Sequence, residues 1–211
     1  MSAPGPMRLA VFASGGGSNF GAILGAVADG RLPARVVLLV TDRDRTGAEG
    51  RAHAAGVPVA VLAPSAYADE DAWAAALLDA LAAHGAEAVA LAGYLKRVPA
   101  EVVAAYRGRI LNVHPSLLPR FGGPGMYGRR VHEAVLAAGA RESGATVHVV
   151  DEHYDTGPVV LQEAVPVLPG DTPEALAARV LEAEHRLFPA ALALLAEGRL
   201  SEDGRRKAED G

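Results

Sequence analysis

Apolar residues follow two kinds of pattern along the first half of the chain. Short β-branched and apolar runs predict buried strands at residues 8–13, 34–41, 57–62, 88–92 and 110–113. Helical spacing of apolar positions predicts helices between these strands, at residues 20–28, 47–55, 72–84 and 99–106. Strands that alternate with helices in this way are typical of a parallel sheet covered on both faces. We therefore expect an α/β protein with a doubly wound, mostly parallel sheet.

The pattern changes after the fifth predicted strand. Residues 145–150 alternate between two faces, and residues 159–167 follow them as a second strand. We expect these two strands to pair antiparallel, at the C-terminal edge of the sheet. Further helices are predicted at residues 129–138 and from residue 172 to about residue 197. Thr172-Pro173-Glu174 starts the last helix with a capping residue, a first-turn proline and an acid.

The composition fits one globular domain. The chain has 211 residues, of which 50% are hydrophobic, and no apolar run reaches the roughly 18 residues of a membrane span. We assign residues 8–200 to a single domain. Residues 1–7 and 201–211 lack apolar periodicity, so we expect a disordered leader and a disordered tail. The absence of cysteine excludes disulfides and thiolate metal sites.

Charge narrows the range of partners. Twenty Lys and Arg residues against 25 Asp and Glu residues give a net charge of −5, which disfavours general binding to nucleic acid. The first residues lack the basic and apolar pattern of a secretory signal. We therefore expect a cytoplasmic protein that binds small molecules rather than nucleic acid or a membrane, as a monomer or a homodimer.

A candidate site lies at the end of the fifth predicted strand. Pro115 ends this strand, so Asn112 and His114 lie at its carboxyl end. Side chains two residues apart on a strand point to the same side, and open α/β sheets bind ligands beside the carboxyl ends of their strands. A hydrogen-bonding amide and an imidazole that titrates near neutral pH thus face one crevice. The alternative is a structural histidine, which is the commoner role beside a buried strand.

The glycine-rich segment from Ser14 to Asn19 is a second candidate. It lies between a predicted strand and a predicted helix, so backbone N–H groups and the positive end of the helix dipole converge on one point. This arrangement is typical of phosphate binding, with Gly17, Ser18 and Asn19 nearest the anion. The segment lacks both the Gly-x-Gly-x-x-Gly pattern and the lysine of a P-loop, which disfavours dinucleotides and nucleoside triphosphates. A flexible turn is the alternative.

Three acids precede Gly157-Pro158, namely Asp151, Glu152 and Asp155. A carboxylate held in such a turn can accept a hydrogen bond from an imidazole, favour its charged form and fix its tautomer. An exposed acidic turn is the alternative.

These segments resemble the folate-dependent formyltransferase family. The run Asn-Val-His-Pro-Ser-Leu-Leu-Pro at residues 112–119 is similar to the family signature, in which the Asn and the His polarise the formyl group of 10-formyltetrahydrofolate. The segment before Gly157-Pro158 resembles the family's Asp-x-Gly-Pro segment. Matching by Gly-Pro makes Asp155, rather than Asp151, the partner of the catalytic histidine. The resemblance covers nearly all of residues 8–200 and implies a Rossmann-like formyltransferase fold.

The resemblance also implies two substrate sites. Gly17, Ser18 and Asn19 match the family's phosphoribosyl-binding loop, and Glu184 matches the glutamate that contacts the glycinamide substrate. The segment after the fourth predicted strand matches the family segment whose backbone binds the pterin ring. The candidate folate-binding residues are therefore Leu95, Lys96, Arg97, Val98 and Asn112.

By this resemblance, the protein transfers the formyl group of its co-substrate 10-formyltetrahydrofolate to the amine of glycinamide ribonucleotide in purine synthesis. The amine attacks the formyl carbon, and Asn112 and protonated His114 stabilise the oxyanion. Asp155 raises the pKa of His114 and orients its ring. The chemistry requires no metal.

Three other functions compete with this one. A formyltetrahydrofolate hydrolase and a methionyl-tRNA formyltransferase use the same formyl chemistry, but each carries an added domain for which we expect no room in this chain. A non-catalytic nucleotide-binding module is the rival of a different class. Such a module would give no reason for Asn112, His114 and Asp155 to converge.

Two histidines and one loop have open roles. His148 either faces the crevice of His114 or lies elsewhere on its strand. His132 is either catalytic or part of the polar face of a solvent-facing helix. The glycine-rich loop at residues 120–128 is a candidate lid over the substrate.

Two charged segments complete the expectations. We expect residues 42–45 to form a solvated loop of mixed sign, without chemistry. The family commonly has an arginine, which pairs with the folate's glutamate carboxylate, where this chain has Glu70. Either this carboxylate is left in water, or Lys96 or Arg97 binds it.

Overall fold

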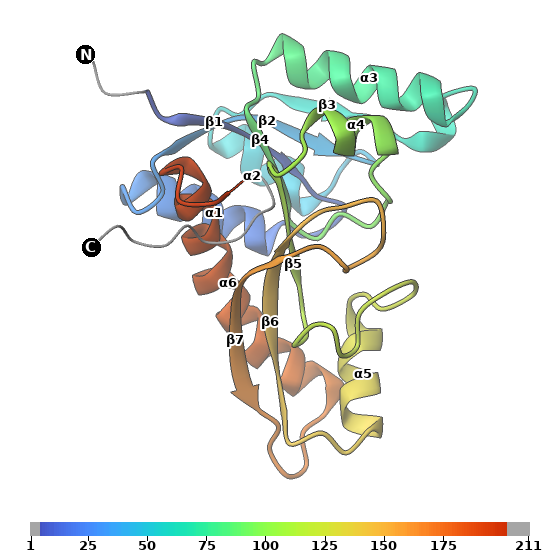
Figure 1. The fold of residues 1–211 in the computed structure, drawn as a ribbon, viewed down its shortest axis with the longest axis vertical. Helices are drawn as coiled ribbons and strands as arrows, with labels where there is room; N and C mark the ends of the chain where they lie inside the picture. Colours follow the sequence, from blue (N-terminus) through green and yellow to red (C-terminus); the bar gives the residue numbers. More distant parts are fainter. Residues whose placement is uncertain (1–4, 202–211) are drawn as a thin grey trace.

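Seven strands form one sheet in the computed structural model, which describes residues 5–201 (Figure 1). The strands are β1 (Met7–Phe12), β2 (Ala34–Thr41), β3 (Val59–Val61), β4 (Ala88–Leu91), β5 (Ile110–His114), β6 (Glu142–Val149) and β7 (Val159–Pro166). The helices are α1 (Ser18–Ala28), α2 (Gly47–Ala54), α3 (Glu70–Ala83), α4 (Ala100–Ala105), α5 (Arg129–Ala137) and α6 (Pro173–Ala196), with a 3-10 turn at Pro64–Ala66.

The sheet has the predicted topology. Its strand order is β3-β2-β1-β4-β5-β6-β7. Strands β1 to β5 pair parallel, whereas β6 pairs antiparallel with both β5 and β7. The doubly wound, mostly parallel sheet with an antiparallel C-terminal edge is therefore confirmed.

Several boundaries differ from the predicted ones. Helix α3 begins at Glu70, two residues before the predicted start, because the side chain of Asp69 caps it by accepting a hydrogen bond from the Ala72 N–H at 2.8 Å. Strand β6 begins at Glu142, three residues before the predicted start. Its first residues pair with β7 along the edge of the sheet, with Glu142 opposite Pro166.

Alternating residues of β1, an interior strand of the sheet, pack into two separate cores. Leu9 and Val11 of β1 pack into the core that α1, α2 and α6 cover. Ala10 and Phe12 point to the opposite face and pack into the core of α3 and α4. Figure 1 shows α3 and α4 on one side of the sheet and α1 and α6 on the other. Burial on both faces explains why the central strands are apolar at nearly every position.

Met7 lies in β1, one residue before the predicted start of the domain. The predicted disorder of residues 1–4 and 202–211 falls outside the described residues. Within residues 5–201, no helix combines the length and the apolar character needed to cross a bilayer.

Candidate active site

A cavity of about 700 Å³ opens at the carboxyl ends of β4 and β5. Side chains from α1, α5, α6 and β6 also line it, together with the loops after β4 and before α5. Every predicted site residue except Gly17 lines this cavity. Residues that are far apart in the sequence thus meet where open α/β sheets bind ligands.

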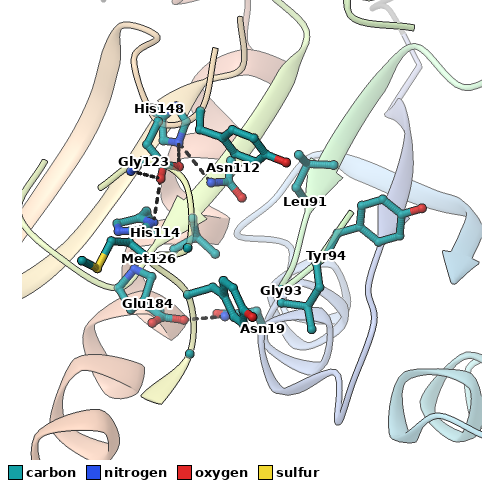
Figure 2. A pocket seen from close by; sticks show the side chains of 18 of the residues that line it. Asn19, Leu91, Gly93, Tyr94, Asn112, His114, Gly123, Met126, His148 and Glu184 are labelled. Carbon is teal, nitrogen blue, oxygen red and sulfur yellow. Dashed lines mark hydrogen bonds and ion pairs between the residues drawn. The ribbon is translucent and has the colours of Figure 1, made fainter. Parts of the chain in front are cut away.

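Asn112 and His148 face each other across the β5–β6 pair (Figure 2). Asn112 Nδ2 lies 3.0 Å from His148 Nε2, and His148 Nδ1 lies 2.9 Å from the Val149 carbonyl oxygen. Because a carbonyl only accepts, Nδ1 carries a proton, and Nε2 lies between the Asn112 amide and the Asp155 carboxylate. The second N–H of Asn112 is left for a ligand. His148 therefore faces the same crevice as His114, as the alternation of residues 145–150 allowed.

His114 is 4% exposed, and both of its ring nitrogens have protein neighbours. Nε2 lies 2.9 Å from the Phe121 carbonyl oxygen and therefore carries a proton. Nδ1 lies 3.5 Å from Asp155 Oδ2. The predicted convergence of these side chains is thus present in the structure.

The net direction of the His114 pKa differs from the expected one. Burial lowers this pKa below its ordinary value, and the nearby Asp155 carboxylate offsets only part of the effect. The contribution of Asp155 has the expected sign, but burial is the larger effect on the His114 pKa. The sequence gives no measure of how deeply the imidazole is buried.

Asp155 holds three groups of the site together. Its Oδ2 accepts a hydrogen bond from the Gly123 N–H at 2.9 Å, and its Oδ1 lies 3.5 Å from His148 Nε2. Burial raises its pKa, but the contacts with His148, His114 and Gly123 outweigh burial and lower the pKa overall. Its backbone adopts a φ of 56°, which is uncommon outside glycine and typical of strained functional positions.

Asp151 has a different environment. Its carboxylate accepts hydrogen bonds from the His153 N–H and the Thr156 hydroxyl, within its own turn. Asp155, rather than Asp151, is therefore the carboxylate beside His114, which agrees with the choice made from the Gly-Pro match.

The glycine-rich loop at residues 120–128 forms one wall of the cavity. The Phe121 carbonyl contacts His114, and the Gly123 N–H contacts Asp155, so the loop is tied to the candidate catalytic groups at two points. Met126 and Tyr127 also line the cavity. Closure of this loop as a lid stays a prediction.

Asn19 and Glu184 meet on another wall of the cavity (Figure 2). Asn19 Nδ2 donates to Glu184 Oε2 at 2.6 Å, and burial raises the pKa of Glu184 to about 7, although this hydrogen bond lowers it. Asn19 Oδ1 is buried and has no partner. An unsatisfied buried acceptor beside a cavity marks a place where a ligand can donate a hydrogen bond.

The glycine loop leaves the start of α1 open. Gly17 is the N-cap residue, no side chain caps the helix, and the first turn contains no acid. A Cβ atom added at Gly15 or at Gly16 would meet nothing within 4 Å. Uncapped N–H groups beside open space suit an anion.

Gly17 itself is required by packing. Its φ is 69°, and a Cβ atom there would lie 2.7 Å from Ala48 Cα of α2. We expect Gly17→Ala to lower the free energy of unfolding by roughly 2 kcal/mol or more, from backbone strain plus this overlap. Urea unfolding measures it, with Gly16→Ala as the matched control. Equal stability of the two variants would contradict this packing.

Of the two alternatives for His132, the structure excludes the solvent-facing position. His132 is 5% exposed, lies on the buried side of α5 with Val131 and Val135, and lines the cavity. Its Nδ1 has no partner. Burial and, to a lesser extent, the nearby His114 lower the pKa of His132. The sequence signal was its place beside Val131 in the apolar stripe of the helix.

The expectation that residues 42–45 form a solvated loop is wrong for Asp42. Its side chain is only 2% exposed, and it pairs with Arg43 at 2.9 Å and with Lys96 at 3.7 Å. Asp44 and Arg45 are exposed, as expected. Asp42 differs because it directly follows β2 at the carboxyl edge of the sheet.

The two candidate cations for the folate tail already have protein contacts. Lys96 pairs with Asp42, and Arg97 Nη2 donates to the Glu152 carbonyl oxygen at 3.1 Å. Glu70 is exposed at the start of α3 and does not line the cavity. Binding of a folate carboxylate by Arg97 stays a prediction.

No group of three or more His, Cys, Asp or Glu residues in the described part of the chain is arranged to hold a metal ion.

Comparisons with known proteins connect this site to one family. The sequence profile of a family described as formyl transferase matches residues 7–192. The chloroplastic phosphoribosylglycinamide formyltransferase of Arabidopsis thaliana is 48% identical over 204 residues, covering 95% of this chain and 70% of that protein. The Mycobacterium tuberculosis phosphoribosylglycinamide formyltransferase is 44% identical, covering 90% of this chain and 86% of that protein.

The fold of the whole chain also agrees with a solved structure. The crystal structure of glycinamide ribonucleotide transformylase 1 from Symbiobacterium toebii has a TM-score of 0.91 and 42% sequence identity. The match covers 100% of this chain and 98% of that one.

Proposed function

Because the chain belongs to the formyl transferase family, we propose that it is a phosphoribosylglycinamide formyltransferase that takes the formyl group from 10-formyltetrahydrofolate. The acceptor is the free amine of glycinamide ribonucleotide, and the reaction belongs to purine synthesis. The observation that carries the proposal is the convergence of Asn112, His114 and Asp155 in one cavity. A module that only binds nucleotides has no use for these three groups together.

The reaction is an acyl transfer between two nitrogens. The acceptor amine attacks the formyl carbon, so negative charge develops on the formyl oxygen. The bond between the formyl carbon and the folate nitrogen then breaks, and this nitrogen leaves with a proton while the amine loses one. A donor aimed at that oxygen is stabilising because charge appears there only in the transition state. We assign this role to the second N–H of Asn112 Nδ2, whose first N–H is held by His148. The side-chain oxygen of Asn112 points away from His148 (Figure 2).

His114 supplies the second stabilising group. His114 lines the cavity, and the positive charge of its imidazolium form stabilises an anion that develops beside it, because a buried site screens charge less than water does. Nδ1 is the nitrogen that faces the ionised Asp155, which favours the protonated form and fixes the ring. Asp155 thus acts through His114, because it offsets part of the decrease that burial causes in the His114 pKa.

The acceptor occupies the wall formed by Asn19, Glu184 and the start of α1. The open N–H groups of α1 suit its phosphate. The hydroxyl or amine groups of a nucleotide can donate to the unpartnered Asn19 Oδ1 and to Glu184. The donor occupies the wall formed by Leu95–Val98, which brings its formyl group toward Asn112.

We expect Gly16→Val to weaken binding of glycinamide ribonucleotide by roughly 10-fold or more, because a side chain would fill the open space beside the α1 N–H groups. Binding of 10-formyltetrahydrofolate should change little. Calorimetry with each ligand alone measures both effects. Gly16 is a better position than Gly17, where a side chain overlaps α2 and would disturb the fold. Equal losses for both ligands would exclude an acceptor phosphate at this loop.

A formyltetrahydrofolate hydrolase is the alternative with the same chemistry. Release of tetrahydrofolate, measured with and without glycinamide ribonucleotide, separates the two functions. The proposed function requires that turnover depend on the acceptor. Rapid release of formate without an acceptor would make the protein a hydrolase.

The cytoplasmic location and the oligomeric state, monomer or homodimer, stay predictions. The Arabidopsis relative is described as chloroplastic.

A further inference from the structure

We propose that Asp42 and Ser14 are positioning residues for the formyl donor, because together they hold the loop at residues 93–98 in its binding conformation. This inference rests on the proposed function for its ligand. The contacts that carry it lie between three neighbouring strand ends, after β2, β1 and β4.

Ser14 is the central link. It is 3% exposed and directly follows the buried residue Ala13 after β1. Its backbone N–H donates to the Gly93 carbonyl oxygen at 3.2 Å, and its Oγ accepts from the Leu95 N–H at 2.9 Å. The Asp42 side chain lies nearby: burial raises the Asp42 pKa, but the neighbouring Arg43 and Ser14 side chains lower it overall. Ser14 therefore passes a contact from the end of β2 to the loop after β4.

Asp42 holds the same loop at a second point. Its Oδ2 lies 3.7 Å from Lys96 Nζ, next to the residue that Ser14 holds. The Asp42 side chain is 2% exposed, whereas those of Arg43 and Lys96 are 53% and 42% exposed. A buried carboxylate needs such partners, since an unpaired charge in the protein interior is costly. In the Asp42–Lys96 pair, the buried Asp42 is therefore fixed in place, and it holds the exposed Lys96 against it.

The loop has no helix or strand of its own, so it is held by these contacts and by the buried side chains of Tyr94 and Val98, which pack in the core of α3 and α4. Residues 93–98 lie between β4 and α4, and Leu95 is 52% exposed, so packing of its side chain contributes little to holding the loop. Leu95, Lys96, Arg97 and Val98 all line the cavity. A loop that is ordered before binding loses less conformational entropy when the ligand arrives. Loss of either contact should therefore weaken binding of the formyl donor more than binding of the acceptor.

The variants are Ser14→Ala and Asp42→Asn, with Asp44→Asn as the matched control on the same loop. Asp44 is exposed and has no part in the site. The first readout is hydrogen exchange at the Leu95 amide in the unliganded protein. We expect it to accelerate roughly 5-fold in Ser14→Ala, the loss of about one hydrogen bond, by a smaller factor in Asp42→Asn, and to stay unchanged in the control. This readout needs no substrate, so it tests the contacts even if the proposed function fails.

The second readout is calorimetry with 10-formyltetrahydrofolate alone and with glycinamide ribonucleotide alone. We expect the Kd of the donor to rise roughly 5- to 10-fold in each variant, with the Kd of the acceptor changed less than about 2-fold. In the double variant, the Kd of the donor should rise by less than the product of the two single increases, because both residues hold the same loop through connected contacts. Unchanged Leu95 exchange, equal losses for both ligands, or fully multiplicative effects would each overturn the proposal.

Discussion

His114→Ala and Asn112→Ala are each expected to lower kcat about 10²-fold or more. This is the order of loss that follows removal of one group that stabilises an oxyanion. Both side chains line the cavity, and neither is needed to pair the strands, whose hydrogen bonds are made by the backbone. Removal should therefore affect turnover more than folding. Single-turnover formyl transfer, with both substrates saturating, measures the effect.

The controls separate chemistry from binding and stability. His53→Ala, at an exposed position of α2, should leave kcat unchanged. The two site variants should keep their thermal midpoint within a few degrees and should still bind glycinamide ribonucleotide. Near-normal turnover of a folded His114→Ala or Asn112→Ala variant would rule out the assigned roles.

Asp155→Asn is expected to lower kcat roughly 10²-fold and to move the activity range toward lower pH. Asparagine keeps the shape, and its oxygen can still accept from the Gly123 N–H, but the negative charge beside His114 is lost. The size of the effect is that of general acid–base catalysis, which requires the correct protonation state of one group.

The direction of the pH shift follows from the sign of each contribution to the His114 pKa. Burial lowers this pKa, and the Asp155 carboxylate raises it. Without the carboxylate, less remains to offset the effect of burial on the His114 pKa. This pKa therefore falls further, and the protonated form is lost at a lower pH. The falling limb of kcat on the alkaline side should therefore move to lower pH. An unchanged profile together with an unchanged kcat would reduce Asp155 to a turn residue.

The sheet and the Asn112–His114 pair could be predicted because they depend on short-range patterns. Apolar runs define the strands, Pro115 ends β5, and a spacing of two puts both side chains on one side. The partner of His114 could not be chosen in the same way. Asp151 and Asp155 lie in one turn, and only the resemblance through Gly157-Pro158 distinguished them.

The burial of individual polar residues could not be predicted from the sequence. Asp42 lies in a run of alternating charges, and only contacts with Ser14 and Lys96, which are distant in sequence, make it a buried ion-pair member. The polar face stayed an alternative for His132 because an imidazole is counted as polar, although this residue lies beside Val131 in the buried stripe. In both cases tertiary contacts decide the environment, and local patterns contain no information about them.

The depth of the site also reversed one electrostatic expectation. A carboxylate near a histidine predicts a raised pKa when the imidazole is solvated. His114 is 4% exposed, so the loss of solvation is the larger effect. The contact with Asp155 could be predicted, but its net result required the structure.

The fate of the formyl oxygen tests direct attack by the acceptor amine most directly. 10-Formyltetrahydrofolate labelled with ¹³C and ¹⁸O in its formyl group is mixed with glycinamide ribonucleotide and the protein in ordinary water, and the formylated product is analysed by mass spectrometry. Direct attack, with the oxyanion held by Asn112 and His114, predicts that both labels arrive together on the acceptor. Product that carries ¹³C without ¹⁸O, or labelled formate in place of formylated acceptor, would contradict it.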